Sequence, residues 1–241
     1  MAIFRHPNDS KWAENGGILK SHNVSFGGNG SGTQEWEDIS RLKEQAWVDR
    51  YDYEAKILSK ICEKNNYTKI LELGSGPGTL ANTLNQIHSK KLHYTLIDKP
   101  HAKSQFKALN YNAAKFKVLD LNNGFDSKEL DNDYDLVICN DFLEHVANVT
   151  DILVTIYNLT KKDASLFVSV PNWRMGHSFQ YQGLFDHDNW MHTLKVHGWE
   201  PYILYSSPLK CQPLPRLSSE ETLPENFIDS WNLYYETKKI N

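Results

Sequence analysis

The sequence has only three cysteines in 241 residues, and Cys62, Cys139 and Cys211 lie far apart along the chain. No two of them form a CxxC pair, so the sequence predicts neither a disulfide framework nor a zinc knuckle. A chain with so few thiols does not depend on an oxidising compartment. We therefore expect a cytoplasmic protein.

Long apolar runs and an excess of positive charge are also absent. No hydrophobic stretch approaches the roughly 20 residues of a membrane span, and the N-terminal MAIFRHPNDS lacks the apolar segment of a signal peptide. The formal net charge is −4, which gives no general electrostatic reason to bind nucleic acid. These absences predict no membrane partner and make a polynucleotide partner an unfavoured choice.

The most informative stretch is Lys69–Leu80, KILELGSGPGTL. A short apolar run leads into three glycines within five residues, and Leu80, Leu84 and Ile87 then recur at helical spacing. This pattern predicts a strand, a Gly-rich turn and a helix, an arrangement that brings the backbone close to a nucleotide-like ligand.

Two details of this stretch argue against a nicotinamide dinucleotide. The third glycine of that fingerprint would stand at position 79, which is Thr79 here. Glu72 precedes the turn, and a buried carboxylate would oppose a pyrophosphate. The same carboxylate suits a ligand with positive groups, and S-adenosylmethionine carries a sulfonium and an ammonium.

After this turn, strands and helices alternate, which predicts a parallel sheet with helices on both faces. Ligands of such sheets bind beyond the carboxyl ends of the strands, where polar residues follow four of the predicted strands. The predicted strands are 92–97, 116–119, 134–139 and 165–170, the predicted helices are 102–109 and a segment around 149–159, and the polar residues are Asp98, Asp120, Asn140 and Asn172.

The two ends of the chain depart from this alternation. Residues 1–33 are polar and turn-rich, and apolar residues then indicate one helix from Thr33 and a second around Ile57–Cys62. Near the other end, a helix over 188–197 precedes strands over 202–205 and 231–238. The long connection between those two strands predicts a hairpin, so the last strand should run antiparallel.

In this order of motifs the chain closely resembles the Rossmann-like S-adenosylmethionine-dependent methyltransferases over residues 51–241. The first motif is matched by the segment from Glu72 to Gly78, and the string from Asp141 to Val146 is similar to the DxLEHV signature of small-molecule enzymes. The resemblance implies a three-layer α/β sandwich with a seven-stranded, mostly parallel sheet. Residues 1–50 would then be an N-terminal extension that acts as a lid.

The resemblance also implies which residues bind the cofactor. Asp98 would hold the ribose hydroxyls, and Asp120 and Leu121 would lie beside the adenine. Arg50 stands where related enzymes sometimes hold the methionine carboxylate, although a solvated arginine on a helix is the alternative. The full implied set is Arg50, Glu72, Gly74, Ser75, Gly76, Asp98, Lys99, Asp120, Leu121 and Asn140.

His145 and His187 are the candidate catalytic residues. Methyl transfer to a hydroxyl needs a base to take the proton, and both histidines follow predicted strands of the sheet. The alternative for His145 is a structural bond to the backbone. Asp141, Glu144 and His145 also resemble the E-x-x-E-H metal site of some O-methyltransferases, but the first position is the shorter Asp, and we expect no metal.

We therefore predict a methyltransferase that acts on oxygen or nitrogen of a small molecule, with S-adenosylhomocysteine as its product. Trp173, Arg174 and Tyr181 combine aromatic surface with hydrogen-bonding groups and are the predicted acceptor-binding residues. The alternatives are a metal-assisted RNA 2′-O-methyltransferase, a nicotinamide-dependent oxidoreductase and a protein that binds the cofactor without turnover.

Overall fold

The structure is a computed structural model that describes residues 45–109, 114–121, 127–171, 187–208, 217–218 and 230–240. The N-terminal extension up to residue 44 and the acceptor candidates Trp173, Arg174 and Tyr181 lie outside the described residues. Within the described part of the chain, none of the helices has the length and apolar character to cross a membrane.

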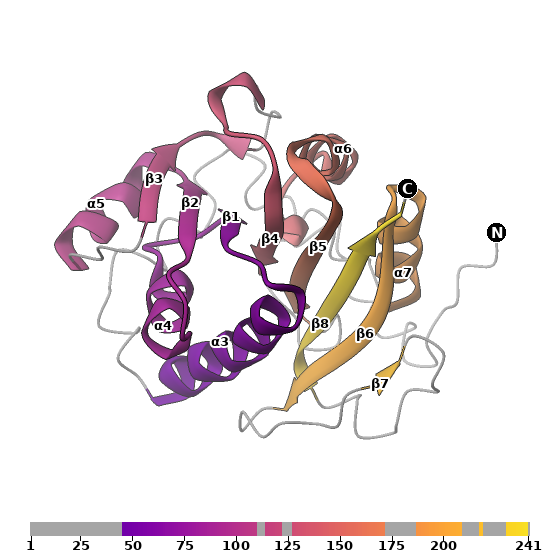
Figure 1. Cartoon of the computed structure of the whole chain (residues 1–241), viewed down its shortest axis with the longest axis horizontal. Coiled ribbons are helices and arrows are strands. Elements are labelled where there is room, and N and C mark those ends of the chain that lie inside the picture. The colour runs from indigo at the N-terminus through magenta and orange to yellow at the C-terminus, as the bar shows by residue number, and fades with distance from the viewer. Residues whose placement is uncertain are drawn as a thin grey trace, which may run out of the picture.

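One sheet organises the chain, and its strands follow the order β3-β2-β1-β4-β5-β8-β6-β7 (Figure 1). The parallel strands β1 to β5 place the carboxyl ends of β1, β2, β3 and β4 at one edge. β8 runs antiparallel to both β5 and β6, as predicted. The strands are β1 Lys69–Leu73, β2 His93–Asp98, β3 Ala114–Val118, β4 Tyr134–Asn140, β5 Thr160–Pro171, β6 Trp199–Pro208, β7 Leu217–Ser218 and β8 Ser230–Lys239.

The sheet therefore has the predicted seven main strands, and the two-residue β7 adds an eighth at the edge beside β6. Strand lengths differ modestly from our expectation, since β5 and β6 extend beyond the apolar cores that marked them. Strand pairing continues through polar residues because the backbone, not the side chain, forms the ladder.

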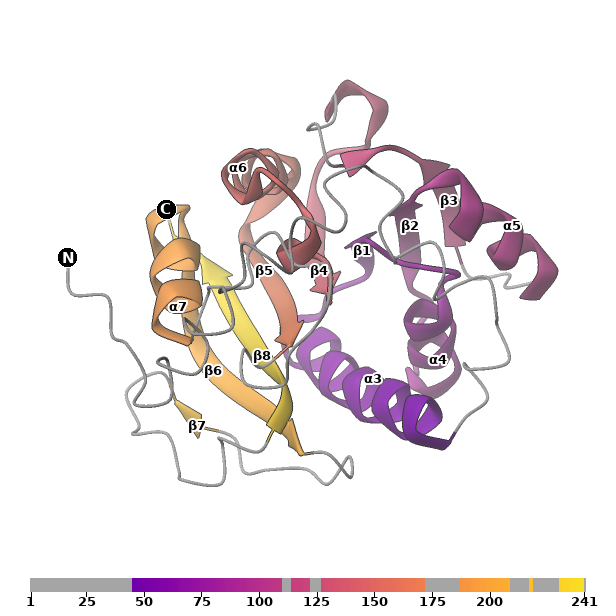
Figure 2. The same ribbon diagram turned by 180° about the vertical axis from the view of Figure 1, so that it is seen from behind.

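Helices cover both faces of the sheet, which gives three layers (Figures 1 and 2). α3 and α4 pack on one face in a cluster that includes Leu58, Leu84 and Phe167. α6 and α7 pack on the other face, where Ile152, Trp190 and Val168 are buried together. The helices are α3 Gln45–Asn65, α4 Thr79–Ile87, α5 Pro100–Leu109, α6 Val149–Leu159 and α7 His187–Val196, with short 3₁₀ turns η3 Ser127–Glu129 and η4 Leu143–His145.

α3 corrects one prediction. Trp47 and the Ile57–Cys62 segment, which we assigned to two helices, belong to a single helix of 21 residues. No glycine or proline interrupts residues 45–65, so nothing in the sequence breaks the helix there. The boundary that we predicted between residues 50 and 51 therefore falls within a continuous helix.

α6 shows how local sequence fixes the end of a helix. The Asn148 side chain accepts a hydrogen bond from the Asp151 N–H at 3.2 Å, an N-cap of the usual kind. Five apolar residues then fall on one buried stripe that faces the sheet. The connection from β4 into α6 is thereby held beside the carboxyl edge of the sheet.

Candidate functional site

The Gly-rich turn after β1 is tied to the end of β2. Gly74 and Ser75 donate their N–H groups to the Ile97 carbonyl at 3.0 and 3.1 Å. The Gly76 N–H donates to Asp98 Oδ2 at 2.6 Å, and the Lys99 N–H donates to Oδ1 at 2.6 Å. The structure thus brings the predicted glycines and the predicted ribose-binding carboxylate into direct contact.

Asp120 and Leu121 follow β3 at the same edge. The Leu119 N–H donates to the Asp98 carbonyl at 3.2 Å, which places these residues next to the end of β2. Leu121 is buried, whereas Asp120 is exposed. One apolar and one acidic side chain therefore continue the row of predicted residues along the edge.

Glu72 is a buried carboxylate with an unsatisfied oxygen. Its side chain lies in the last part of β1, and no donor among the described residues bonds Oε2. Burial, with the nearby charges of Glu54 and Asp98, raises the pKa of Glu72 to about 8. A group that is costly to ionise in isolation is suited to a cationic ligand, which would stabilise its charge.

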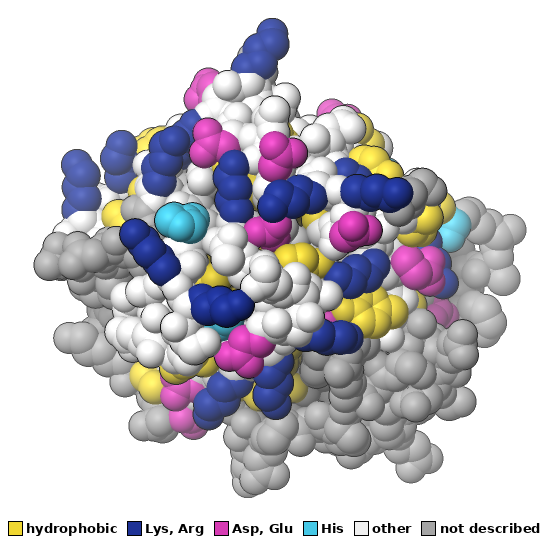
Figure 3. Space-filling view, viewed as in Figure 1, with side chains coloured by type: hydrophobic (Ala, Val, Ile, Leu, Met, Phe, Trp, Pro, Cys, Tyr) yellow, Lys and Arg dark blue, Asp and Glu magenta, His cyan; other side chains and the backbone are white. Residues whose placement is uncertain are grey.

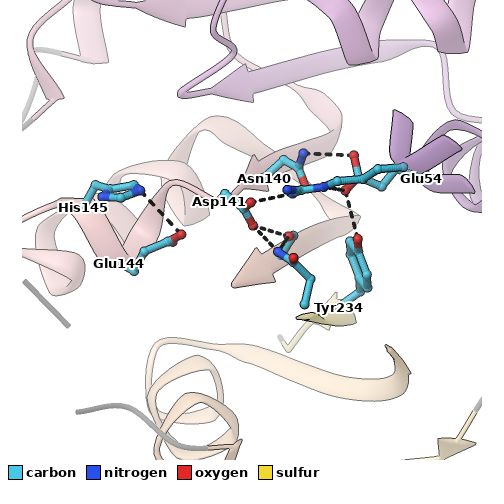
Figure 4. Close-up of polar contacts among 9 residues, drawn as sticks. Glu54, Asn140, Asp141, Glu144, His145 and Tyr234 are labelled. Atoms are coloured by element: carbon cyan, nitrogen blue, oxygen red, sulfur yellow. Dashed lines mark hydrogen bonds and ion pairs between the residues drawn. The ribbon is translucent and has the colours of Figure 1, made fainter. Parts of the chain in front are cut away.

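Asn140 and Arg50 both contact Glu54, a residue of α3 that sequence analysis did not single out (Figure 4). Glu54 is fully buried, and it accepts hydrogen bonds from Arg50 Nε at 2.8 Å and from Asn140 Nδ2 at 3.0 Å. The Tyr234 hydroxyl, from β8, donates to the same carboxylate at 3.0 Å. The helix, β4 and β8 are thus joined by one side chain at the carboxyl edge.

Arg50 is buried, so the alternative of a solvated arginine is wrong. Its guanidinium pairs with Glu54 and also with Asp141 Oδ2, at 2.5 Å. Burial alone would lower the pKa of Arg50, but the charges of Asp141 and Glu54 outweigh it and hold the pKa well above its ordinary value. Arg50 therefore remains a buried cation within the site.

Asp141 follows β4 in a left-handed conformation with φ 46°, which is unusual for a residue other than glycine. Its N–H donates to the Ser169 carbonyl at 3.0 Å. Its Oδ1 accepts from Ser169 Oγ at 2.6 Å and from Asn232 Nδ2 at 2.5 Å. These bonds, with that from Arg50, hold the turn in a conformation that the backbone alone would disfavour.

Glu144 and His145 lie in η4, away from the cluster around Glu54 (Figure 4). Glu144 is buried, and neither oxygen has a hydrogen bond to any described residue. Its Oε1 lies 3.6 Å from Nε2 of His145, whose side chain is 33% exposed. Burial, together with the charge of Asp141, raises the pKa of Glu144 well above its ordinary value.

Asp141, Glu144 and His145, which resemble a metal site in the sequence, do not converge on one point in the structure. The Asp141 carboxylate is engaged by Arg50, Ser169 and Asn232, while Glu144 pairs with His145 (Figure 4). Among the residues that the structure describes, no group of three or more His, Cys, Asp or Glu side chains is arranged to hold a metal ion. The described geometry gives the metal alternative no support.

His187, the second candidate base, begins α7 and stacks on a tyrosine of β8. Its ring lies parallel to that of Tyr235, with centroids 5.7 Å apart, and its Nδ1 is 3.1 Å from the Tyr235 hydroxyl. In the structure, His145 therefore lies near the carboxyl group of Glu144, whereas His187 lies near the hydroxyl group of Tyr235.

Sequence reasoning missed Glu54, Ser169, Asn232 and Tyr234. One signal was present for Glu54, because it stands four residues after Arg50 and such a pair shares a helix face. The other three are polar groups within strands, and only the pairing of β5 with β8 brings them to the site.

Comparison with known proteins agrees with this geometry. A family model described as a methyltransferase domain matches residues 41–203. No curated protein matches the chain.

Several solved structures share the fold at low sequence identity. An O-methyltransferase family protein from Burkholderia thailandensis is 11% identical, with a TM-score of 0.61 over 97% of this chain and 70% of that one. A SAM-dependent methyltransferase from Aquifex aeolicus is 13% identical, with a TM-score of 0.57 over 87% and 98%. The plantazolicin methyltransferase BamL, in complex with a triazolic desmethylPZN analog and SAH, is 15% identical, with a TM-score of 0.59 over 87% and 94%.

The strand order with its antiparallel β8, the Gly-rich turn beside Asp98 and the family match over most of the chain lead to one conclusion. The chain belongs to the methyltransferase domain family and is an S-adenosylmethionine-dependent methyltransferase domain with a Rossmann-like fold.

Proposed function

We propose that the chain methylates an oxygen or nitrogen of a small-molecule acceptor, with the cofactor bound at the carboxyl edge of β1 to β4. The observation that carries the placement of the cofactor is a pair of buried acceptors, Glu72 Oε2 and Asn140 Oδ1, that receive no hydrogen bond from the described residues. Buried acceptors are nearly always paired in folded proteins, so both oxygens are suited to a ligand that brings donors or positive charge.

The two acceptors lie on neighbouring strands and on the same face of the sheet. Glu72 of β1 is the register partner of Ile138, and Asn140 stands two residues further along β4, so its side chain points to the same side. S-adenosylmethionine supplies an activated methyl group on a sulfonium, together with an ammonium and a carboxylate. Glu72 and Asn140 fit its positive groups, Arg50 fits its carboxylate, and Asp98 fits its ribose hydroxyls.

His145 is the proposed general base. It ends η4 in the connection after β4, is partly exposed, and has Glu144 Oε1 3.6 Å from Nε2. A neutral imidazole has one ring nitrogen without a proton, and that nitrogen accepts a proton from the acceptor. Oxygen and nitrogen nucleophiles carry such a proton, and removing it as the new bond forms aids transfer.

A small acceptor is favoured over a polynucleotide by charge. On the face in Figure 3, Lys and Arg side chains are accompanied by Asp and Glu side chains, and the whole chain has a net charge of −4. Phosphate backbones are bound through clustered positive charge. Trp173, Arg174 and Tyr181 remain our candidates for contacting the acceptor.

The test is incubation of the chain with methyl-labelled S-adenosylmethionine and a cell extract, followed by fractionation into small molecules, RNA and protein. We expect label in the small-molecule fraction, and at least a tenfold lower rate for His145→Gln with cofactor affinity unchanged. Label confined to RNA would support the RNA 2′-O-methyltransferase alternative. Cofactor binding without labelled product in any fraction would support the non-catalytic alternative.

A further inference from the structure

Three donors converge on Glu54, and two of them belong to residues of the proposed cofactor site. The Glu54 carboxylate accepts from Arg50 Nε and Tyr234 Oη with Oε1, and from Asn140 Nδ2 with Oε2. Glu54 itself is fully buried on α3. Burial raises the pKa of Glu54, whereas the charge of Arg50 and the hydrogen bonds from Arg50 and Tyr234 lower it. A carboxylate accepts several bonds and donates none, so the three donors fit the ionised form.

The contact with Asn140 decides how its amide is oriented. An ionised Glu54 accepts hydrogen bonds but has none to give, so the amide must turn its NH₂ group toward Oε2. Its Oδ1 is then directed away from Glu54, where it is buried and receives no hydrogen bond from any described residue. Glu54 thus orients Asn140, so that its Oδ1 lies at the end of β4 as an acceptor that receives no hydrogen bond from a described residue.

The contact with Arg50 fixes a cation near the same place. Glu54 and Asp141 each accept one of the five N–H groups of the guanidinium, at 2.8 and 2.5 Å. The planar group is therefore held from two sides, and Trp47 lies 5.4 Å from its centre. An arginine held in this way is pre-organised to bind a carboxylate with little loss of entropy.

We propose that Glu54 is a positioning residue for the amino-acid end of the cofactor. It turns the Asn140 oxygen toward the ammonium and holds the Arg50 guanidinium for the carboxylate, without itself contacting the ligand. The inference rests on the proposed function. It extends that function by assigning the recognition of the amino-acid group to a buried side chain of α3.

The experiment compares two ligands that differ in the amino-acid group, which is the part that Glu54 is proposed to help bind. S-adenosylhomocysteine carries the amino-acid group, whereas 5′-methylthioadenosine has the same nucleoside and sulfur without it. Glu54→Gln should weaken S-adenosylhomocysteine by about 10- to 100-fold, because two charge-assisted contacts lose their support. The same variant should change the affinity for 5′-methylthioadenosine by less than about twofold.

Two further variants separate positioning from general stability. Tyr234→Phe removes one donor to Glu54 but keeps the ring that stacks on Phe167, so we expect a smaller loss, again confined to S-adenosylhomocysteine. Ser59→Ala is the matched control, since Ser59 is a buried polar residue of the same helix that contacts His88 instead. It should leave both affinities unchanged.

Equal losses for the two ligands, or no loss for either in Glu54→Gln, would overturn the role of Glu54. If Glu54→Gln does not fold, Tyr234→Phe decides, and unchanged S-adenosylhomocysteine affinity in that variant overturns the role. A wild-type chain that binds neither ligand would instead overturn the proposed function, so the two failures are distinguishable.

Discussion

Glu72 is the residue on which the electrostatics of the site depend most. Without a ligand its burial raises the pKa to about 8 from an ordinary value near 4.5. The native state therefore binds a proton that the unfolded chain releases, and this contribution to stability is present below about pH 4.5 and is lost as the pH rises through 8. A bound cation instead favours the ionised form of Glu72, because it stabilises the negative charge of the carboxylate.

Binding of S-adenosylhomocysteine, which carries an ammonium, should therefore release a proton from Glu72 near neutral pH. The affinity should rise with pH up to about 8, by at most about tenfold per pH unit. Calorimetry in phosphate and in Tris measures the release, because the two buffers differ in ionisation enthalpy. Glu72→Gln should show no release and a flat pH dependence, and an unchanged release in that variant would assign the proton to another group.

The sequence motifs predicted that the Gly-rich turn and Asp98 lie together at the carboxyl edge of the sheet, and this contact is present. Gly76 lies in the turn after β1 and Asp98 ends the adjacent parallel strand β2, so the motif and the topology together place them in contact. Glu54 and Tyr234 are 180 residues apart, and nothing near either residue indicates that they meet. Their contact depends on β8 inserting between β5 and β6, a result of the whole sheet.

Among the elements, the turn between β1 and α4 has little room for a side chain at Gly74. Gly74 has φ 67°, and a Cβ added there would lie 2.5 Å from Phe142 Cδ2. Two features therefore require glycine at position 74: the left-handed backbone conformation and the close approach of the chain after β4. The glycine pattern in the sequence predicted the first requirement, whereas the second needs the tertiary structure.

Gly74→Ala should lower the free energy of unfolding by about 1–3 kcal/mol or more and should weaken S-adenosylhomocysteine binding. Gly198→Ala is the matched control, since Gly198 has φ 84° and its added Cβ would lie 2.5 Å from Tyr157 Cε2. Gly198 follows α7 and precedes β6, at the opposite edge of the sheet. Urea unfolding should show similar losses for both variants, and calorimetry should show lost affinity only for Gly74→Ala. Equal affinities would contradict a role of the turn in binding.

For the whole molecule, the alternation of strands and helices predicted the layers and the parallel sheet, and the long final connection predicted the antiparallel β8. Strand order then places the ends of β1, β2, β3 and β4 side by side, although their residues come from four separate parts of the chain. The continuity of α3 was not predicted, because apolar spacing marks a buried face but does not say where a helix is interrupted.

We propose that this edge of the sheet binds S-adenosylmethionine through Glu72, the Gly-rich turn and Asp98. The most direct measurement is a calorimetric titration of the wild type and of Asp98→Asn with S-adenosylhomocysteine and with NADH. We predict one S-adenosylhomocysteine per wild-type chain and no binding of NADH. Binding to Asp98→Asn should be about 100-fold weaker, because we expect the Asp98 carboxylate to accept from the ribose hydroxyls. Tight binding of NADH with no response to S-adenosylhomocysteine would show that this edge does not bind S-adenosylmethionine.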